Sequence, residues 1–553
     1  MKSAGLVRPV YACGAMTSPY DTYTSPLASR NASAQMLGIW SPRHKFNTWR
    51  QIWLAVASSQ HEMGLPVSAE QVAELRRVVQ RSGGIADAEL AAAEGYERQL
   101  RHDVMAHVHA LGDVCPLAKG IIHLGMTSQD VVCNADLLIL RQASALVMVK
   151  CARTIDALLR TGKRYLGLPT LGFTHYQPAQ PVTVGRRMYG WAYELSLVQN
   201  RLRQQDEQFQ LKGFRGATGT QASYLALFGG DGAKVDAFEA RAVALCLGEE
   251  IPSAELATAA SLAELAGVSG EAAEIVGVMM RAQATPAGYL ASCTHALVTQ
   301  NYPRVCDAFI LADLAACASV LHKVATDIRL LCNRKEVDEP FEDKQIGSSA
   351  MPYKRNPMRC ERICGLCRFV MNLVGNAYDT AATQWLERTL DDSSNRRLSL
   401  PEAFLALDGA LDLMHNVASG LVVHEATVRA NLMDELPFMV TENILMACVG
   451  LGADRQEYHE VIRVHAQAAG LRVKQEGREN DLLERLKADP HFHSAARGGK
   501  LASELDWSGV LDPMAYIGRS IEQAERFAAA MAAPDELLAK YFPDGVAESA
   551  PRV

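Results

Sequence analysis

The sequence has few prolines and cysteines for its length and no large excess of charge of either sign. Its 553 residues contain 22 prolines and 13 cysteines, and 55 basic against 62 acidic side chains give a net charge of −7. This charge excludes a generally basic nucleic-acid-binding protein. No uninterrupted apolar run approaches the ~20 residues that a membrane helix needs. We therefore expect neither a nucleic acid nor a membrane as a partner.

The cysteines are too sparse for a disulfide scaffold, and their number is odd. Cys317 and Cys448 stand in apolar stretches, which is typical of a reducing compartment, so we expect a cytoplasmic protein. The closest approach to a metal motif is Cys360, Cys364 and Cys367. Structural zinc usually needs four ligands, and no second pair follows. We predict no metal site.

The few prolines leave long gaps in which a helix can continue without a break. Proline removes a backbone N–H and clashes with the preceding turn, so such gaps permit very long helices. Strand signals are scarce, and we predict an all-α fold built on long helices. The proline-free stretches are residues 117–168, 182–251, 304–339, 358–400, 402–436 and 438–489.

Two of these stretches carry apolar residues at heptad-like spacing, which predicts a helical bundle. The bundle lies within one chain or is shared between subunits. One seam comprises Ile310, Leu314, Cys317, Leu321, Val324, Ile328 and Leu331, and the other Phe404, Leu407, Leu411, Met414, Val417 and Leu421. We divide the chain into an N-terminal helical domain (1–127), a central long-helix domain (128–423) and a C-terminal helical domain (424–553).

Residues 346–362 combine features of an active-site loop that precedes a helix. Ser348 and Ser349 stand close to Lys354, Arg355 and Asn356, and neighbouring glycine and proline favour a loop. Oriented donors together with a cation suit a carboxylate whose negative charge grows during a reaction. The alternative of a solvated surface loop explains this combination poorly.

Residues 171–181 place Thr174 and His175 just before what we predict to be a helix start marked by Pro178 and Pro181. A histidine there can transfer protons near neutral pH. A single histidine is more often structural, and the residues alone leave both interpretations open.

Two further segments favour anion binding. Arg101, His102 and Asp103 stand at a predicted helix end, and the spacing to the next histidines does not suit a metal. Thr127 and Ser128 are placed to begin a helix, where free N–H groups bind carboxylates or phosphates. Simple capping is an equal alternative for this second segment.

Residues 385–397 hold Arg388, Ser393 and Arg397 on a predicted helix or bend. Forked arginines recognise phosphate, although a salt-bridged surface fits equally well. From residue 352 to residue 397, eight basic side chains face five acidic ones. The acidic chain thus concentrates cations in this region.

Taken together, these segments resemble the fumarase/aspartase superfamily and, within it, the adenylosuccinate branch. Gly347 to Asn356 carries the superfamily's Gly-Ser-Ser, Met-Pro, Lys and Asn pattern. The similarity runs from about residue 19 to about residue 490. Other similar segments are Ser25–Arg30, Arg101–Asp103, His123–Ser128, Gly172–Gln180, Gly219–Ser223, Trp385–Arg397 and Glu435–Asn443.

The resemblance implies a reaction. Members of this branch cleave adenylosuccinate to AMP and fumarate, and the succinylated aminoimidazole carboxamide ribotide to its carboxamide ribotide and fumarate. The reaction is a β-elimination by general acid and base, without metal or organic cofactor. A base removes the proton next to a carboxylate, and an acid then protonates the leaving nitrogen.

The resemblance also implies residue roles. Ser348 would be the base, with Ser349 as the alternative, and His175 the general acid. Lys354 would hold the succinyl carboxylate, His102 would support substrate and proton placement, and Glu361 would orient His175 or Lys354. The implied substrate-binding residues are Arg30, Asn31, Arg101, Asp103, Thr127, Ser128, Gln300, Asn356, Arg362, Arg388, Ser393 and Arg397.

Family members are homotetramers with a central helical core and active sites shared between subunits, and we expect the same here. Two departures stand out. Asn31 occupies a position that is usually aromatic, and the Ala-rich residues 242–299 hold an insertion.

The competing interpretations are another fumarate-releasing lyase, such as argininosuccinate lyase, and a catalytically silent helical scaffold. The second predicts the loss of Ser348, Lys354 or His175, and all three are present.

Overall fold

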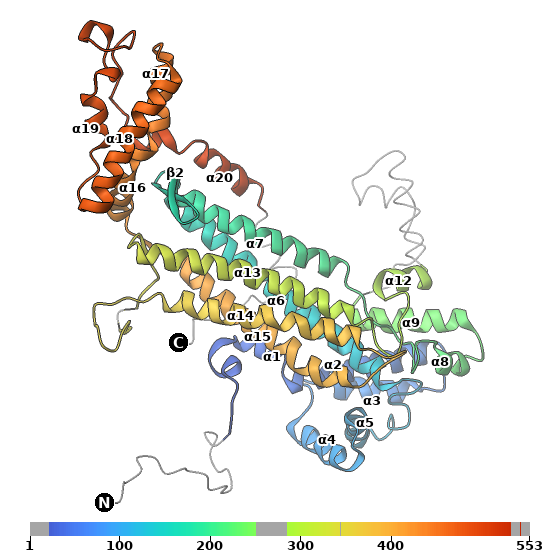
Figure 1. Cartoon of the computed structure of the whole chain (residues 1–553). Coiled ribbons are helices and arrows are strands. Elements are labelled where there is room, and N and C mark those ends of the chain that lie inside the picture. Colours follow the sequence, from blue (N-terminus) through green and yellow to red (C-terminus); the bar gives the residue numbers. More distant parts are fainter. Residues whose placement is uncertain (1–21, 250–284, 343, 532–541, 543–553) are drawn as a thin grey trace, which may run out of the picture.

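A bundle of long helices dominates the computed structural model, which describes residues 22–249, 285–342, 344–531 and 542 (Figure 1). The longest rod, α6, has 37 residues and so runs about 54 Å at 1.5 Å per residue. The rods are α6 (Ser128–Arg164), α7 (Val184–Glu207), α13 (Val305–Asn333), α14 (Met358–Ala382) and α15 (Asp391–Gly420). This architecture confirms the predicted mostly helical fold with long central helices.

Both predicted seams face the main hydrophobic core of this bundle. On α13, residues Leu314 to Leu331 of the seam are buried, whereas Ile310 at its start is only partly buried. On α15, Phe404 and Leu407 are completely buried, and the seam ends at buried Leu421. The heptad-like spacing therefore identified the faces along which the rods pack.

A layer of shorter helices covers one end of the bundle. Its own apolar core includes Trp49, Trp53 and Phe238, all almost fully buried. The layer begins after η2 (Leu27–Asn31) and α1 (Ala34–Ile39), which lie along α15. It comprises α2 (Pro42–Glu62), α3 (Ala69–Val79), α4 (Asp87–Leu100), α5 (Asp103–Val114), α8 (Ala222–Leu227), α9 (Gly232–Leu247) and α12 (Pro286–Cys293).

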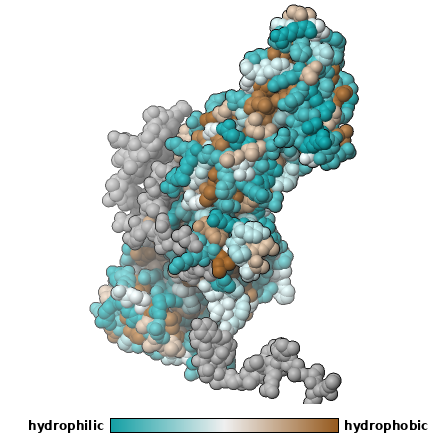
Figure 2. Space-filling model, turned by 90° about the vertical axis from the view of Figure 1, so that its left-hand side faces the viewer, coloured by the Kyte–Doolittle hydropathy of each residue, from teal (hydrophilic) through white to brown (hydrophobic). Residues whose placement is uncertain are grey.

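The opposite end carries a projecting helical segment with a separate core around Leu436, Tyr458 and Phe492 (Figure 1). The surface that Figure 2 shows is mainly hydrophilic, with small scattered apolar patches. Helix α20 (Ser520–Ala529) returns from this segment to pack on α7. The segment comprises α16 (Glu425–Met439), α17 (Thr441–Gly450), α18 (Arg455–Glu476), α19 (Leu482–Ala488) and the short turns η4 (Pro490–Phe492), η5 (Ala495–Arg497) and η6 (Pro513–Tyr516).

The expectation of a helix start directly after His175 is wrong. Residues Pro169–Thr174 form β1 and Gln177–Thr183 form β2, an antiparallel hairpin, and helix α7 begins only at Val184. Prolines within β2 are compatible with an edge strand, which has no further neighbour to receive an N–H. A second small ladder pairs β3 (Val337–Asp338) with β4 (Val422–Val423).

Helices α6 and α13 are long and apolar enough to cross a membrane by length and composition alone. The sequence suggested no such segment. Within the bundle, however, Lys150 of α6 is buried and forms ion pairs at 2.5 and 2.8 Å with Asp408 and Asp412 of α15. A buried charge with partners on the adjacent rod fits a core helix of a bundle.

The three-part division at residues 127 and 423 stays a prediction. Most of the predicted insertion within 242–299 lies outside the described residues, which end at 249 and resume at 285. Helix α12 packs on α9, so the described flanks of this stretch meet beside the N-terminal layer.

Candidate functional site

A cavity of about 630 Å³ opens where the N-terminal layer meets the rods. Seven residues singled out in the sequence line it: Arg101, His102, Asp103, Ser128, Arg388, Ser393 and Arg397. Thr127 precedes Ser128, and the side chain of Gln300 accepts a hydrogen bond from Arg388 at 2.8 Å. The fold thus gathers nine of the predicted residues, from four separate stretches of sequence, at one place.

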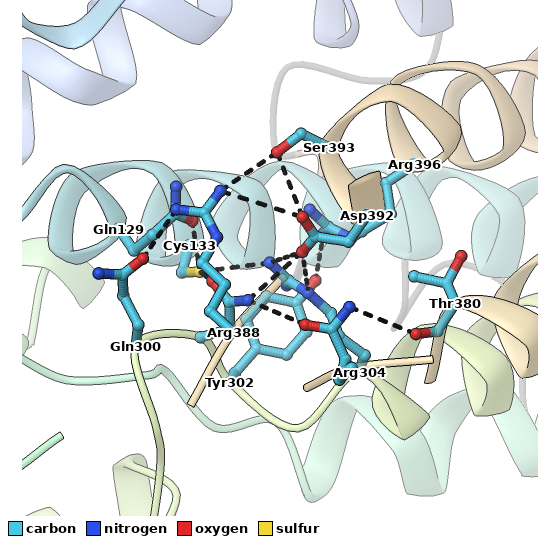
Figure 3. A network of polar contacts seen from close by, with 12 residues as sticks. Gln129, Cys133, Gln300, Tyr302, Arg304, Thr380, Arg388, Asp392, Ser393 and Arg396 are labelled. Atoms are coloured by element: carbon cyan, nitrogen blue, oxygen red, sulfur yellow. Dashed lines mark hydrogen bonds and ion pairs between the residues drawn. The ribbon is translucent and has the colours of Figure 1, made fainter. Parts of the chain in front are cut away.

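Arg388 is held at this cavity by a buried polar network (Figure 3). Its guanidinium donates to Ser393 at 3.3 Å and lies 3.9 Å from the completely buried carboxylate of Asp392. Burial lowers the pKa of Arg388, and Asp392 opposes that effect. The same carboxylate accepts from the buried Arg304 at 2.8 Å. Asp392 therefore contacts both Arg388, a predicted phosphate ligand, and Arg304, which the sequence did not single out.

A second buried arginine supports the floor of the network. Arg396 donates to Asp307 at 2.7 Å and to Asp136 at 3.0 Å, and it also donates to the hydroxyl of Tyr302. Burial disfavours its charge, but Asp307 keeps the pKa of Arg396 above the ordinary value. On α15, Ser393 and Arg397 line the cavity, Asp392 pairs with Arg304 beneath it, and Arg396 does both, lining the cavity and pairing with Asp307.

The junction of α4 and α5 supplies the opposite wall. Arg101 ends α4 in the left-handed conformation, with φ of 54°. His102 caps α5 by accepting the N–H of Met105 at Nδ1, 3.3 Å away, which leaves Nε2 to carry the proton of the neutral ring. Asp103 pairs with Arg397 across the cavity at 2.9 Å. The predicted anion-binding triplet is therefore in direct contact with the arginine segment.

Helix α6 begins at this cavity. Its N-cap residue Thr127 donates its backbone N–H to the carboxylate of Asp130 at 2.9 Å. Ser128, the first helical residue, lines the cavity. Free N–H groups and the helix dipole favour negative charge at such a start. The structure shows the capping interaction, and the anion-binding interpretation stays a prediction.

His175 stands at the tip of the β1–β2 hairpin. Thr174 pairs with Gln177, and the two residues between them, His175 and Tyr176, have φ of 52° and 57°. Two-residue hairpin turns with positive φ at both positions normally use asparagine and glycine. A histidine and a tyrosine in this conformation are strained, and such strain concentrates at functional sites. His175 is exposed to solvent.

The predicted catalytic loop also departs from regular structure. The Ser348 hydroxyl accepts the N–H of Met351 at 3.2 Å, and Asn356 donates its side-chain amide to the carbonyl of Gly347 at 2.9 Å. A side chain at Gly347 would meet the carbonyl of Lys354, so the loop closes tightly on a glycine. Lys354 is exposed. As predicted, the loop leads directly into helix α14.

The base of this loop is anchored at both ends. The Glu339 carboxylate accepts the N–H groups of Arg359 and Cys360 at 3.0 and 2.6 Å, at the start of α14. Glu361, in the first turn of α14, lies 4.0 Å from Arg329. Among the described residues of one chain, Glu361 makes no contact with His175 or Lys354.

A third group of predicted residues lies along the middle of α15. Arg30 and Arg362 are close enough that Arg30, after burial, contributes to lowering the pKa of Arg362. Asn31 packs against Gly409, and the backbone N–H of Ser33 donates to Asp408 at 2.6 Å. Asp408 thus fixes the segment that presents Arg30.

The catalytic loop and the cavity are far apart within one chain, whereas Arg362 follows the loop closely, in the first turns of α14. Gly420 contacts Pro340 at the base of the catalytic loop, whereas Ser393 lines the cavity. A helix that advances from residue 393 to residue 420 spans about 40 Å at 1.5 Å per residue. The hairpin of His175 follows the far end of α6, whose start lines the cavity (Figure 1). A single chain therefore carries the predicted acid and base at one end of its bundle and the cavity lined by the predicted anion ligands at the other.

Several residues of the site were missed in the sequence. Asp392 and Arg396 lie between residues that were singled out, and Arg304 and Lys45 lie outside the recognised motifs. Asp392 could have been identified, because an acidic residue between the predicted anion ligands Arg388 and Ser393 is placed to orient them. Nothing in the sequence alone brings Arg304 or Lys45 to the cavity.

Comparison with known proteins identifies the family of this chain. The family described as "Lyase" matches residues 29–228 and 293–372, and the family described as "Adenylosuccinate lyase C-terminus" matches residues 437–527. The chain is 43% identical to an adenylosuccinate lyase of Saccharomyces cerevisiae over 92% of its length and 94% of that protein. It is 44% identical to one of Schizosaccharomyces pombe with the same coverage.

Solved structures show the same fold. A fumarate lyase from Mesorhizobium superposes with a TM-score of 0.68, at 19% identity, over 90% of this chain and 98% of that one. A 3-carboxy-cis,cis-muconate lactonizing enzyme from Pseudomonas putida gives the same score at 23% identity, over 93% and 99%. Fold and family match define a lyase of the fumarase/aspartase superfamily. Within it, the chain belongs to the adenylosuccinate lyase family.

Proposed function

We propose that the chain cleaves adenylosuccinate to AMP and fumarate, and the succinylated aminoimidazole carboxamide ribotide to its carboxamide ribotide and fumarate. The observation that carries this proposal is the cavity in which Arg388, Ser393 and Arg397 face His102 and Ser128. Forked arginines beside a helix start suit a phosphate monoester. The names of the relatives supply the reaction class.

The chemistry requires a strong base for a weakly acidic C–H bond. Ser348 serves as this base, and the N–H of Met351 beside its hydroxyl supports the alkoxide form. Lys354 and Asn356 hold the succinyl carboxylate that takes up negative charge in the transition state. Ser349 is the alternative base. His175 protonates the leaving nitrogen as fumarate separates, a step that general acids accelerate by roughly 10²–10⁴-fold.

In one chain the catalytic loop lies about 40 Å from the cavity. Because these two parts cannot act on one substrate at that distance, we assign the complete site to an oligomer. In a homotetramer with antiparallel rods, the loop and hairpin of one subunit meet the cavity of another, and Arg30 and Arg362 come from a third. Exposed apolar residues along the rods, such as Phe309 on α13 and Tyr193 on α7, support burial between subunits. Glu361 would then meet His175 or Lys354 of another chain.

We assign the enzyme to the cytoplasm and to chemistry without a cofactor. All described cysteines are free, which suits a reducing compartment. The β-elimination described above uses only side chains of the protein.

An ultraviolet assay with purified protein and adenylosuccinate tests the proposal. We expect the absorbance change that accompanies release of AMP and fumarate. Argininosuccinate is the control substrate, because another fumarate-releasing lyase of this superfamily would cleave it instead. A folded protein that leaves adenylosuccinate intact contradicts the proposal, and a silent scaffold would leave both compounds intact.

A further inference from the structure

A lysine that no motif includes projects into the same cavity. Lys45 stands in the first turns of α2 and lines the cavity together with Arg101, Arg388 and Arg397. Its ammonium lies 5.3 Å from the ring centre of Phe46 and 5.0 Å from that of Trp49. Trp49 is completely buried, so one of the two rings beside this ammonium is fixed in the core. The charge is thereby held at a fixed point of the cavity wall.

Two of the carboxylates near this ammonium are engaged elsewhere, and a third, Glu97, also lines the cavity. Asp136 pairs with Arg396 at 3.0 Å, and Asp103 pairs with Arg397 at 2.9 Å. In the part of the chain that the structure describes, Lys45 forms no ion pair within 4.0 Å. Burial lowers the pKa of Lys45, and Asp136 only partly compensates.

Among the described residues, the Lys45 ammonium has Glu97 nearby but no carboxylate within 4.0 Å, whereas Arg397 pairs with Asp103 at 2.9 Å. Desolvated lysines are stabilised when an anion binds next to them, because the added negative charge favours the ammonium form. A phosphate monoester dianion supplies such a charge, whereas a ribose or a purine ring does not. An ammonium has three N–H donors, and those that do not point at the two ring faces are available to a ligand in the cavity.

We infer that Lys45 is a further substrate-binding residue, whose ammonium contacts the phosphate of the nucleotide beside Arg397. This inference rests on the proposed function and extends it, since it adds a ligand to the phosphate subsite. The stem packing offers a competing explanation, in which Lys45 serves only to hold α2 against its neighbours. Substitutions that separate charge from packing distinguish the two.

The test uses the full-length enzyme and three variants. Lys45→Met keeps an apolar stem on Phe46 and Trp49 but removes the charge, and Lys45→Arg keeps the charge. Lys119→Met is the control, because Lys119 pairs with Asp113 outside the cavity. Binding of AMP and of adenosine is measured by calorimetry, and thermal unfolding reports on packing.

We expect Lys45→Met to weaken AMP binding by about tenfold or more, the usual effect of losing one charge-assisted hydrogen bond. Adenosine binding and the unfolding temperature should stay unchanged, and Lys45→Arg should recover most of the AMP affinity. Equal losses for AMP and adenosine, or AMP affinity within twofold of the wild type, would overturn the inference. A wild-type enzyme that does not bind AMP would instead refute the proposed function.

Discussion

At the scale of single residues, the site depends on side chains whose backbone conformation glycine would adopt more easily. His175 has φ of 52° in a two-residue turn, and Arg101 has φ of 54° at the end of α4. Left-handed backbone costs a non-glycine residue roughly 1–2 kcal/mol. The chain therefore keeps a destabilising residue at the tip of its hairpin, where a proton donor would act.

This strain gives a prediction for His175. Both His175→Ala and His175→Gly should lose turnover of adenylosuccinate, because both lack the proton donor. His175→Gly should nevertheless be more stable than His175→Ala by about 0.5–1 kcal/mol, after the entropic cost of glycine is subtracted. Urea unfolding of the two variants measures the difference.

Thr174 provides the matched control, because it lies in strand β1 next to the turn. There the order should reverse, with Thr174→Gly less stable than Thr174→Ala. Equal stability of the two His175 variants would show that the turn is not strained. Full activity of His175→Ala would show that His175 is not the general acid.

At the scale of helices and strands, much of the fold follows from the sequence. The proline-free stretch 304–339 and its apolar spacing predicted α13 and the face that it buries. The hairpin was missed because His175 and Tyr176 lack the asparagine and glycine that mark a tight turn. Its prolines resembled a helix start, although an edge strand accepts proline equally well.

The packing of α5 on α2 gives a pH-dependent prediction. His107 is buried and stacks on Phe46 with 3.7 Å between ring centres. Burial, followed by Arg50 and Lys45, lowers the pKa of His107 from 6.5 to about 4. In the unfolded chain His107 is protonated below pH 6.5, whereas in the folded chain it becomes protonated only near pH 4. The stability due to neutral His107 is present above pH 6.5 and is lost as the pH falls.

Between pH 6.5 and pH 5 this single group should remove about 2 kcal/mol of stability. We expect His107→Gln to lose less stability than the wild type over that interval, as measured by urea unfolding at both pH values. His109→Gln on the same helix is the control and should follow the wild type. Parallel pH dependence of the His107 variant and the wild type would contradict the assignment.

At the scale of the whole molecule, the principal finding is the distance between the catalytic loop and the cavity, which carry different groups of the predicted site residues. The motifs predicted the participating residues, because each motif is a short local pattern. They could not predict that Arg388, Ser393 and His102 meet in one chain while Ser348 and His175 lie elsewhere. That separation follows from the length of α6 and α15, which carry one group at each end.

The most direct test of a shared site is complementation between two inactive variants. His175→Ala damages the hairpin end, and Arg388→Ala damages the cavity end. When the two are unfolded, mixed in equal amounts and refolded together, a site that takes these two residues from different subunits is intact in about a quarter of cases. We predict that each variant alone is inactive and that the mixture regains about a quarter of wild-type activity. A mixture that remains as inactive as its components would contradict the shared site.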